Sequence, residues 1–390
     1  SLTQEIQYYL AGADIQAPIA LKELITCKAL SENAESPEVT KLDVLRTLNT
    51  NEEELFPVKN LIKKISSPIA RVQTTQIIDQ ILQSNEQTFI IQAEGGVGKS
   101  IFATQISAYL PDNSICVVFD CFGNGDYRRS SSARHMHKVG LVQIANELAS
   151  QGLCHPLIPS LNATSKDYIK AFLHRLKQAT EKTALLNKDD TSIFVVIDAA
   201  DNAQMAAKEF NDGRSFTVDL MQEKLPEKVK LIVLCRPYRV HLLEAPYKTN
   251  IITLTAFDIT ETKEHLAKYY ANITEQDATE FHRLTSQNPR VQSIALEKGL
   301  SLHEMLRLFG DSPKNIEDTI KDLLNDAIAR VKEQNHLEAP QIDLLCTSIA
   351  TLRPLIPISV LAHLTEISSE QIRSIINDIG GHPIRLNDDY

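Results

Sequence analysis

The fold of this chain is decided by one stretch, Ala93-Glu94-Gly95-Gly96-Val97-Gly98-Lys99-Ser100. It follows the apolar run 88–92 and precedes a segment with a helical pattern over residues 101–110. Its glycines allow backbone N–H groups to turn inward around phosphate, Lys99 supplies a charge for the β- and γ-phosphates, and Ser100 can place its hydroxyl on Mg²⁺. The start of the helix adds a favourable dipole. The stretch therefore predicts a phosphate-binding loop, even though Ala93 stands where the pattern has glycine.

A second short run, residues 66–73, precedes the predicted helix over 74–82 that leads into the strand of the loop. In many P-loop ATPases this position lines the adenine pocket, while the alternative is an ordinary linker that enters a helix. Both interpretations stay open, and the first makes Arg71 a nucleotide-binding residue. The other residues that we expect to bind nucleotide are Gly95, Gly96, Val97, Gly98, Lys99, Ser100 and Ile101.

Further apolar runs alternate with helical patterns after the loop, and they cover residues 114–120, 192–198, 230–236 and 251–254. Short apolar runs rich in β-branched residues are typical of strands buried in a parallel sheet. The second run ends in Asp198, which is the Walker B arrangement, so Asp198 should hold Mg²⁺ opposite Ser100. We predict an α/β P-loop NTPase with a five-stranded parallel sheet and right-handed crossovers.

One motif would favour guanine over adenine as the base of the bound nucleotide. Asn187-Lys188-Asp189-Asp190 fits the guanine-reading pattern NKxD. In GTPases that motif comes after the Walker B strand, whereas here it comes immediately before it. We interpret it as a polar turn before a strand, and we expect ATP to be the nucleotide.

The densest local positive charge follows the strand that ends at Asp120. A glycine-containing loop over 121–129 comes first, and the residues after it include Arg134, His135 and His137. Ligands of open α/β sheets bind at the carboxyl ends of strands, so we expect Asp120 and Arg134 to lie near the phosphates or near a neighbouring subunit. The two histidines make a poor metal pair, because residues two apart diverge on a helix.

From Glu261 onward the strand patterns cease. We predict a P-loop core over 66–257, a helical domain over 258–336 and a winged-helix domain over 337–390, with helical patterns at 342–351, 358–364 and 369–379 before Gly380-Gly381 and a strand-like tail. Residues 1–65 are predicted to be a helical linker region. Because the chain begins at Ser1 and ends in a strand that lacks its partner, we expect a middle piece of a longer protein.

The composition narrows the class of protein. The chain has 390 residues, a formal charge of −10 and a pI near 5.6, which argues against nucleic-acid binding through general basicity. Its six cysteines form no CxxC pair and no apolar run approaches the length of a membrane span. We expect a reduced, cytoplasmic protein that does not insert in membranes.

Residues 66–390 resemble NACHT-type STAND ATPases, the switch modules of NOD-like receptors and of bacterial antiviral proteins. The resemblance rests on Asp198-Ala199-Ala200-Asp201-Asn202, in which a small residue follows the Mg²⁺-binding acid and an acidic position follows further on. Asn202 departs from the second downstream acid of these proteins. Arg236 matches their arginine after the fourth strand. Asn288-Pro289 resembles the proline motif that closes on the nucleotide, which implies that Pro289 contacts it.

The stretch 119–125, with Arg134-His135 after it, is similar to the antiviral STAND (AVAST) subgroup of bacteria. This resemblance implies an N-terminal effector, often a nuclease, a central ATPase and a C-terminal repeat sensor that binds a phage protein. Recognition then drives homo-oligomers, commonly tetramers, that activate the effector. Neither effector nor sensor is visible in this sequence.

Three functions remain in competition: an ATP-dependent oligomerisation switch, a motor-type ATPase, and an ATP-gated transcription regulator that binds DNA through the winged helix. A motor usually has a glutamate next to the Walker B aspartate, and Ala199 occupies that place. The winged-helix segment has few basic residues, so direct nucleic-acid binding is not expected. We therefore predict a slow switch with four catalytic residues: Lys99, Asp198, Asp201 as a group that orients water, and Arg236 as the γ-phosphate sensor.

Overall fold

The computed structural model describes residues 9–12, 14, 16–30, 38–63, 65–129, 131–185, 191–297, 299–309, 312–315, 318, 321–322, 325, 329, 339–352 and 356–379. The chain divides into two compact units, Ser1–Thr255 and Ala256–Tyr390. Three predicted features lie outside the described residues. They are the NKxD turn at 187–190, the tail from Gly380 onward, and most of the end of the predicted helical domain, from residue 316 to 336.

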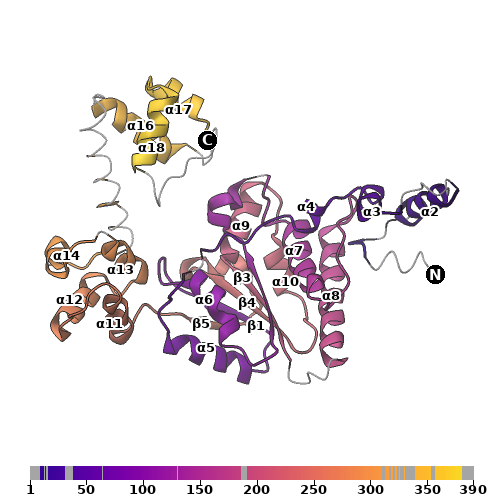
Figure 1. The fold of residues 1–390 in the computed structure, drawn as a ribbon, viewed down its shortest axis with the longest axis horizontal. Coiled ribbons are helices and arrows are strands. Elements are labelled where there is room, and N and C mark those ends of the chain that lie inside the picture. The colour runs from indigo at the N-terminus through magenta and orange to yellow at the C-terminus, as the bar shows by residue number, and fades with distance from the viewer. Residues whose placement is uncertain are drawn as a thin grey trace. The chain divides into compact units, whose positions relative to one another are not determined.

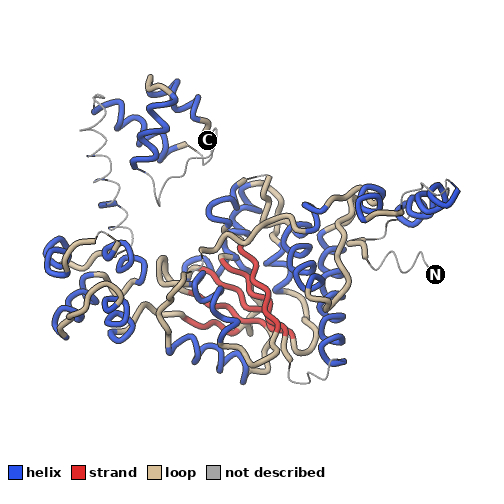
Figure 2. The backbone as a smooth tube through the Cα atoms, viewed as in Figure 1, coloured by secondary structure: helices blue, strands red, loops and turns tan. Residues whose placement is uncertain are grey.

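The first unit is built on a five-stranded parallel sheet with the order β2-β3-β4-β1-β5 (Figure 2). The strands are β1 (Thr88–Gln92), β2 (Ile115–Asp120), β3 (Ile193–Asp198), β4 (Val229–Cys235) and β5 (Asn250–Thr253). The order places β4 between the strand of the glycine-rich loop and the Walker B strand. The predicted fold class, an α/β P-loop NTPase followed by helical segments, is confirmed.

Helices cover both faces of the sheet because its strands are apolar on both sides (Figure 1). In β4, Leu231 and Val233 pack in one core cluster with residues of α7 and α8, while Ile232 and Leu234 pack in the other with α5 and α6. Strands buried on both faces read as continuous apolar runs, which is why they were visible in the sequence. The helices of this unit after residue 70 are α5 (Val72–Gln83), α6 (Lys99–Gln105), α7 (His137–Ser150), α8 (Ser165–Leu185), α9 (Ala200–Glu209) and α10 (Phe216–Met221).

Three departures from the predicted elements concern short helices. The helix predicted over 101–110 is α6 followed by one 3₁₀ turn, η1 (Ile106–Ala108). Helices α9 and α10 were not predicted, and the loop after β2 contains a 3₁₀ segment, η2 (Gly123–Arg128). The strand β4 is likewise followed by a 3₁₀ segment, η3 (Pro237–Leu243). Short helices have too few turns for their periodicity to stand out in a sequence.

Before the sheet, the unit contains α2 (Gln16–Leu30), α3 (Lys41–Thr47) and α4 (Glu52–Leu55). Helix α3 begins in a capping box, in which the Thr40 side chain accepts from the Asp43 amide and the Asp43 side chain accepts from the Thr40 amide. The described residues between α4 and α5, 56–63 and 65–71, belong to no helix or strand.

The second unit is helical throughout its described residues. Its first helices are α11 (Ile259–Ala267), α12 (Glu275–Leu284), α13 (Pro289–Leu296) and α14 (Leu302–Phe309), around a core that includes Leu266, Phe281 and Met305. A separate core holds α16 (Ala339–Thr351), α17 (Ile358–Thr365) and α18 (Ser369–Ile379) together. These three helices lie where the winged helix was predicted, and the predicted wing lies outside the described residues. No helix in the described parts of the chain is long and apolar enough to cross a membrane.

Candidate functional site

The glycine-rich loop lies between the carboxyl end of β1 and the first turn of α6. Gly96 and Gly98 have φ angles of 78° and 108°, in the left-handed region that favours glycine. Ala93 keeps a negative φ, and its N–H donates to the Cys235 carbonyl at 3.2 Å, which continues the pairing of β1 with β4. The first position of this loop therefore needs no glycine, and alanine fits it.

Lys99 lies at the start of α6 and spans the loop. Its ammonium donates to the carbonyl oxygens of Ala93 at 2.5 Å and Glu94 at 3.0 Å. Burial lowers the pKa of this ammonium, and the Asp198 and Asp201 carboxylates act in the opposite direction. The charge of Lys99 thus lies among the acids at the carboxyl ends of the strands.

Asp198 ends β3 and its side chain is almost completely buried. Burial raises its pKa to about 6, and the charge of Asp120 adds to that effect. The Ser100 hydroxyl, the Lys99 ammonium and the Ala199 N–H lower it. The Oδ1 atom of Asp198 is buried without a hydrogen-bond partner.

The Asp198 carboxylate and the Ser100 hydroxyl together fit a divalent cation. A hard cation such as Mg²⁺ takes carboxylate and hydroxyl oxygens as ligands, and it would satisfy the unpartnered Oδ1 atom. Ser100 lies within hydrogen-bonding reach of the same carboxylate. Asp198 and Ser100 would hold the metal, which would supply charge stabilisation at the phosphates.

The residue after Asp198 is in an unusual conformation. Ala199 has φ 55° and ψ 41°, a left-handed geometry that alanine rarely adopts, and it precedes the first residue of α9. The turn directs Asp201, in the first turn of α9, back toward the end of β4. Backbone strain of this kind often lies at functional sites.

Asp201 is buried and is bound by an arginine. Arg239 donates from Nη1 to Asp201 Oδ2 at 3.2 Å and to Asn202 Oδ1 at 3.1 Å. Burial raises the pKa of the Asp201 carboxyl, and Arg239 acts against that rise. Arg239 comes from a segment distant in sequence from Asp201, so no sequence pattern indicated this contact or the place of Arg239 and Asn202 at the site.

Arg236 follows β4 directly, next to the Walker B strand in the sheet. It donates from Nη1 to the Tyr238 hydroxyl at 2.7 Å. The positive charge of Arg236 lowers the pKa of Lys99, and the negative charge of Asp201 raises the pKa of Arg236. The guanidinium of Arg236 therefore lies near both groups. Its role as γ-phosphate sensor stays a prediction.

Arg71 is buried beside the phosphate-binding loop. It precedes α5 and donates to the Val97 carbonyl at 3.3 Å and to the Thr255 carbonyl at 2.6 Å. These bonds hold the loop to the end of the first unit. Contact of Arg71 with nucleotide stays a prediction. So does the contact of Pro289, which lies in the second unit as the first residue of α13.

The positive charges after β2 are paired within the first unit. Arg134 lies within 3.8 Å of the Asp120 carboxylate, and both side chains are buried. His135 bonds to Asp212 at 2.7 Å, and His137 bonds to a different carboxylate, Asp219, at 2.9 Å. The region is therefore a set of separate side-chain pairs, each between one basic residue and one acid. The proximity of Asp120 to nucleotide or to a neighbouring subunit stays a prediction.

One family of known proteins matches part of the first unit. Residues 71–236 match the family described as Nephrocystin 3, N-terminal. This part of the chain is similar to that family, and its fold is that of a P-loop NTPase. The matched range begins at Arg71 and ends at Arg236, so it includes the loop, the Walker B strand and the arginine after β4. No curated protein matches the chain.

Solved structures of low sequence identity also resemble the chain. One is a STAND protein with a tetratricopeptide repeat sensor from Pyrococcus horikoshii, at 12% identity and a TM-score of 0.36, covering 82% of this chain and 44% of that chain. Another is the ORC2 protein of Aeropyrum pernix in ADPNP and ADP complexes, at 12% identity and a TM-score of 0.40, covering 84% and 97%. A third is the ORC1 protein of the same organism in complex with DNA, at 11% identity and a TM-score of 0.35, covering 84% and 86%. The chain thus spans less than half the length of the STAND protein.

Proposed function

We propose that this chain binds ATP with Mg²⁺ and acts as a slowly hydrolysing nucleotide switch of the STAND type. The observation that carries the proposal is the cluster of Lys99, Ser100 and Asp198, in which one carboxylate oxygen of Asp198 is buried and has no hydrogen-bond partner. Charge for the phosphates, a hydroxyl and a carboxylate for the metal are the groups that phosphoryl transfer needs. The family match over 71–236 supports the same class.

Slow hydrolysis follows from the residue beside Asp198. A carboxylate there would orient and activate water, and Ala199 has no such group. The next acid, Asp201, is bound to Arg239 at 3.2 Å, so its charge is already compensated. We infer that Asp201 orients water only weakly, and that the ATP state lasts long enough to act as a signal.

Arg236 is the residue that we propose to distinguish ATP from ADP. A guanidinium donates two charge-assisted bonds to phosphate oxygens, each worth about 1.5–3 kcal/mol. Two such bonds give about 3–6 kcal/mol, against about 5.5 kcal/mol needed to move an equilibrium from 1:99 to 99:1. The γ-phosphate could therefore drive a conformational switch, with oligomerisation as its result.

The biological setting is a finer proposal that rests on resemblance. The stretch 119–125 is similar to the antiviral STAND proteins of bacteria. We propose that a sensor outside this chain binds a phage protein, that the ATP-bound protein then assembles, as a tetramer by resemblance, and that assembly activates an N-terminal effector. Changed protection against phage in cells that carry an Arg236→Ala variant would test this setting.

Turnover of labelled ATP by the purified chain tests the slow switch. We expect a rate below about 1 s⁻¹, the lower end of the usual range for enzymes, and none in Asp198→Asn. A rate near the enzyme median of about 10 s⁻¹ would contradict the switch and favour a motor. Displacement of a bound fluorescent ADP analogue by ATP or by GTP tests which base the protein prefers. If GTP displaced the analogue as well as ATP, the proposed preference for adenine would be wrong.

A further inference from the structure

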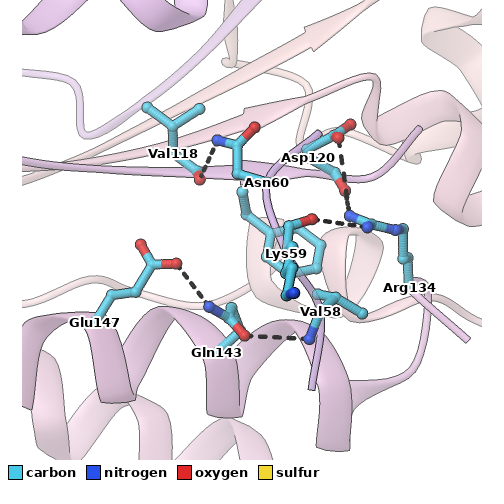
Figure 3. A pocket seen from close by; sticks show the side chains of 9 residues that line it. Val58, Lys59, Asn60, Val118, Asp120, Arg134, Gln143 and Glu147 are labelled. Atoms are coloured by element: carbon cyan, nitrogen blue, oxygen red, sulfur yellow. Dashed lines mark hydrogen bonds and ion pairs between the residues drawn. The ribbon is translucent and has the colours of Figure 1, made fainter. Parts of the chain in front are cut away.

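The outer edge of the sheet is covered by a short stretch that comes before the matched range 71–236. Residues 58–61, here called the edge segment, lie along β2, which is the first strand in the sheet order (Figure 3). Asn60 donates from Nδ2 to the Val118 carbonyl at 3.4 Å, and the Leu61 N–H donates to Asp120 Oδ2 at 3.2 Å. The Val58 N–H donates to Gln143 Oε1 of α7 at 3.3 Å.

Two buried side chains fasten the edge segment to the end of β2. We call Asp120 and Arg134 the clasp. Arg134 donates to the Lys59 carbonyl at 2.8 Å and to the Asp120 carbonyl at 2.6 Å (Figure 3). The Asp120 carboxylate also accepts from two amides of the following turn, Phe122 N at 3.0 Å and Gly123 N at 2.9 Å. The clasp therefore joins three segments: the edge segment, the end of β2 and the turn after it.

The clasp is adjacent to the candidate metal carboxylate. Asp120 is paired in register with Asp198 on the neighbouring strand, and the N–H of Cys121 donates to the Asp198 carbonyl at 3.0 Å. The charge of Asp120 acts on Asp198 strongly enough to contribute to its raised pKa. Two negative charges in one buried region repel each other, because the local dielectric is low.

We propose that the edge segment is an element whose docking responds to Mg²⁺ and nucleotide at Asp198, with the clasp as the connection. The inference rests on the proposed function. A metal ion at Asp198 would compensate one of the two negative charges, so the repulsion between the two carboxylates would fall and Asp120 would hold Leu61 and the following turn more firmly. By reciprocity, a docked edge segment favours the metal-bound state. The clasp thereby links the nucleotide site to α4 and the residues that precede it.

Glycine variants of the turn separate the clasp from its surroundings. A Cβ at Gly123 would lie 2.1 Å from Nε and 2.6 Å from Cζ of Arg134, so Gly123→Ala must displace the guanidinium. Gly125 also has a positive φ, 104°, but a Cβ there meets nothing within 4 Å. Gly125→Ala is therefore a matched control that strains the turn and leaves the clasp intact.

The test is amide hydrogen exchange of peptides that span the edge segment, read by mass spectrometry in Mg²⁺ with ADP, in ADP with EDTA, and without ligand. Calorimetry on the same samples measures ADP binding. In the parent and in Gly125→Ala we expect Mg²⁺ with ADP to slow exchange at Leu61 by about fivefold or more, the lower end of usual couplings between sites. In Gly123→Ala exchange should be fast and unresponsive to ligand.

The outcomes separate this inference from the proposed function. ADP binding without a change in exchange at the edge segment in the parent would overturn the inference alone. Gly123→Ala that responds like the parent would also overturn it. Absence of any ADP binding by the parent would overturn the proposed function and the inference together. If Gly123→Ala does not fold, Asp120→Asn replaces it, because it keeps the shape of the side chain and removes the charge, and it should lose the response to Mg²⁺.

Discussion

Asp198→Asn should stabilise the protein in the absence of metal and nucleotide. The Asp198 carboxylate is fully buried, and its Oδ1 atom has no hydrogen-bond partner. Burial is the largest cause of its raised pKa, and the neighbouring Asp120 is the second that raises it. The ionised form is therefore disfavoured in the folded protein relative to the unfolded chain.

The sign of the pH dependence follows from proton binding. The pKa of Asp198 is raised from 3.8 to about 6, so between these pH values the folded state binds more protons than the unfolded state. Stability then falls as the pH rises through this window, and it stays lower above it. The shift corresponds to about 3 kcal/mol. Because the buried asparagine amide also needs hydrogen-bond partners, we expect Asp198→Asn to gain about 1–3 kcal/mol at pH 7.5.

Urea denaturation in EDTA measures this gain, with unfolding of the first unit followed at pH 7.5, 6 and 4.5. The advantage of Asp198→Asn should shrink as the pH falls. The exposed Asp112→Asn controls for the loss of one negative charge and should show no comparable gain. If Asp198→Asn were less stable than the parent at pH 7.5 without metal, the carboxylate would be well solvated or paired, and the metal assignment would lose its physical basis.

Three further predictions concern the surroundings of the site. Gly140→Ala places a Cβ 2.3 Å from Phe216 Cε1, so urea denaturation should show a loss of about 1–3 kcal/mol, and no loss would contradict the packing of α7 on α10. Ala199→Gly relieves a left-handed alanine and should leave the protein about 0.5 kcal/mol more stable; a loss above about 1 kcal/mol would show that the strain is absent. Arg71→Met deprives the Val97 carbonyl of its donor and should cost about 1–3 kcal/mol and weaken ADP binding in calorimetry. Unchanged ADP affinity would show that Arg71 does not position the loop.

The sheet could be predicted from the sequence because each strand carries its own signal. The middle of a strand buried on both faces is continuously apolar, so the runs at 88–92 and 192–198 needed no tertiary context to be recognised. Helices α9 and α10 gave no such signal. Helix α9 contains three polar residues that are buried, so its sequence pattern does not separate an apolar face from a polar one. These residues are Asp201, Asn202 and Gln204.

The candidate site could be predicted where its residues are close in sequence. Lys99 and Ser100 belong to one loop, and Asp198 is marked by the strand that it ends. The partners that come from distant segments could not be predicted. Arg239 binding Asp201, and Arg134 binding the carbonyl of Lys59, depend on which loops the sheet order brings together. The basic residues after β2 looked like a ligand-binding surface in the sequence, and in the structure an acidic side chain lies opposite Arg128, Arg129, Arg134, His135 and His137.

Isothermal titration calorimetry of Mg²⁺ and ATP, with the parent chain and Lys99→Ala, tests the central claim most directly. Lys177→Ala, on the exposed face of α8, is the matched control for loss of a lysine. On the proposed function, the Lys99 ammonium would make charge-assisted bonds to phosphate worth about 1.5–3 kcal/mol each, so losing even one should weaken binding by about 10-fold to 100-fold. We expect the parent and Lys177→Ala to bind alike and Lys99→Ala to bind at least about tenfold more weakly. Equal affinity of Lys99→Ala and the parent would mean that the loop at 93–100 is not the phosphate-binding site.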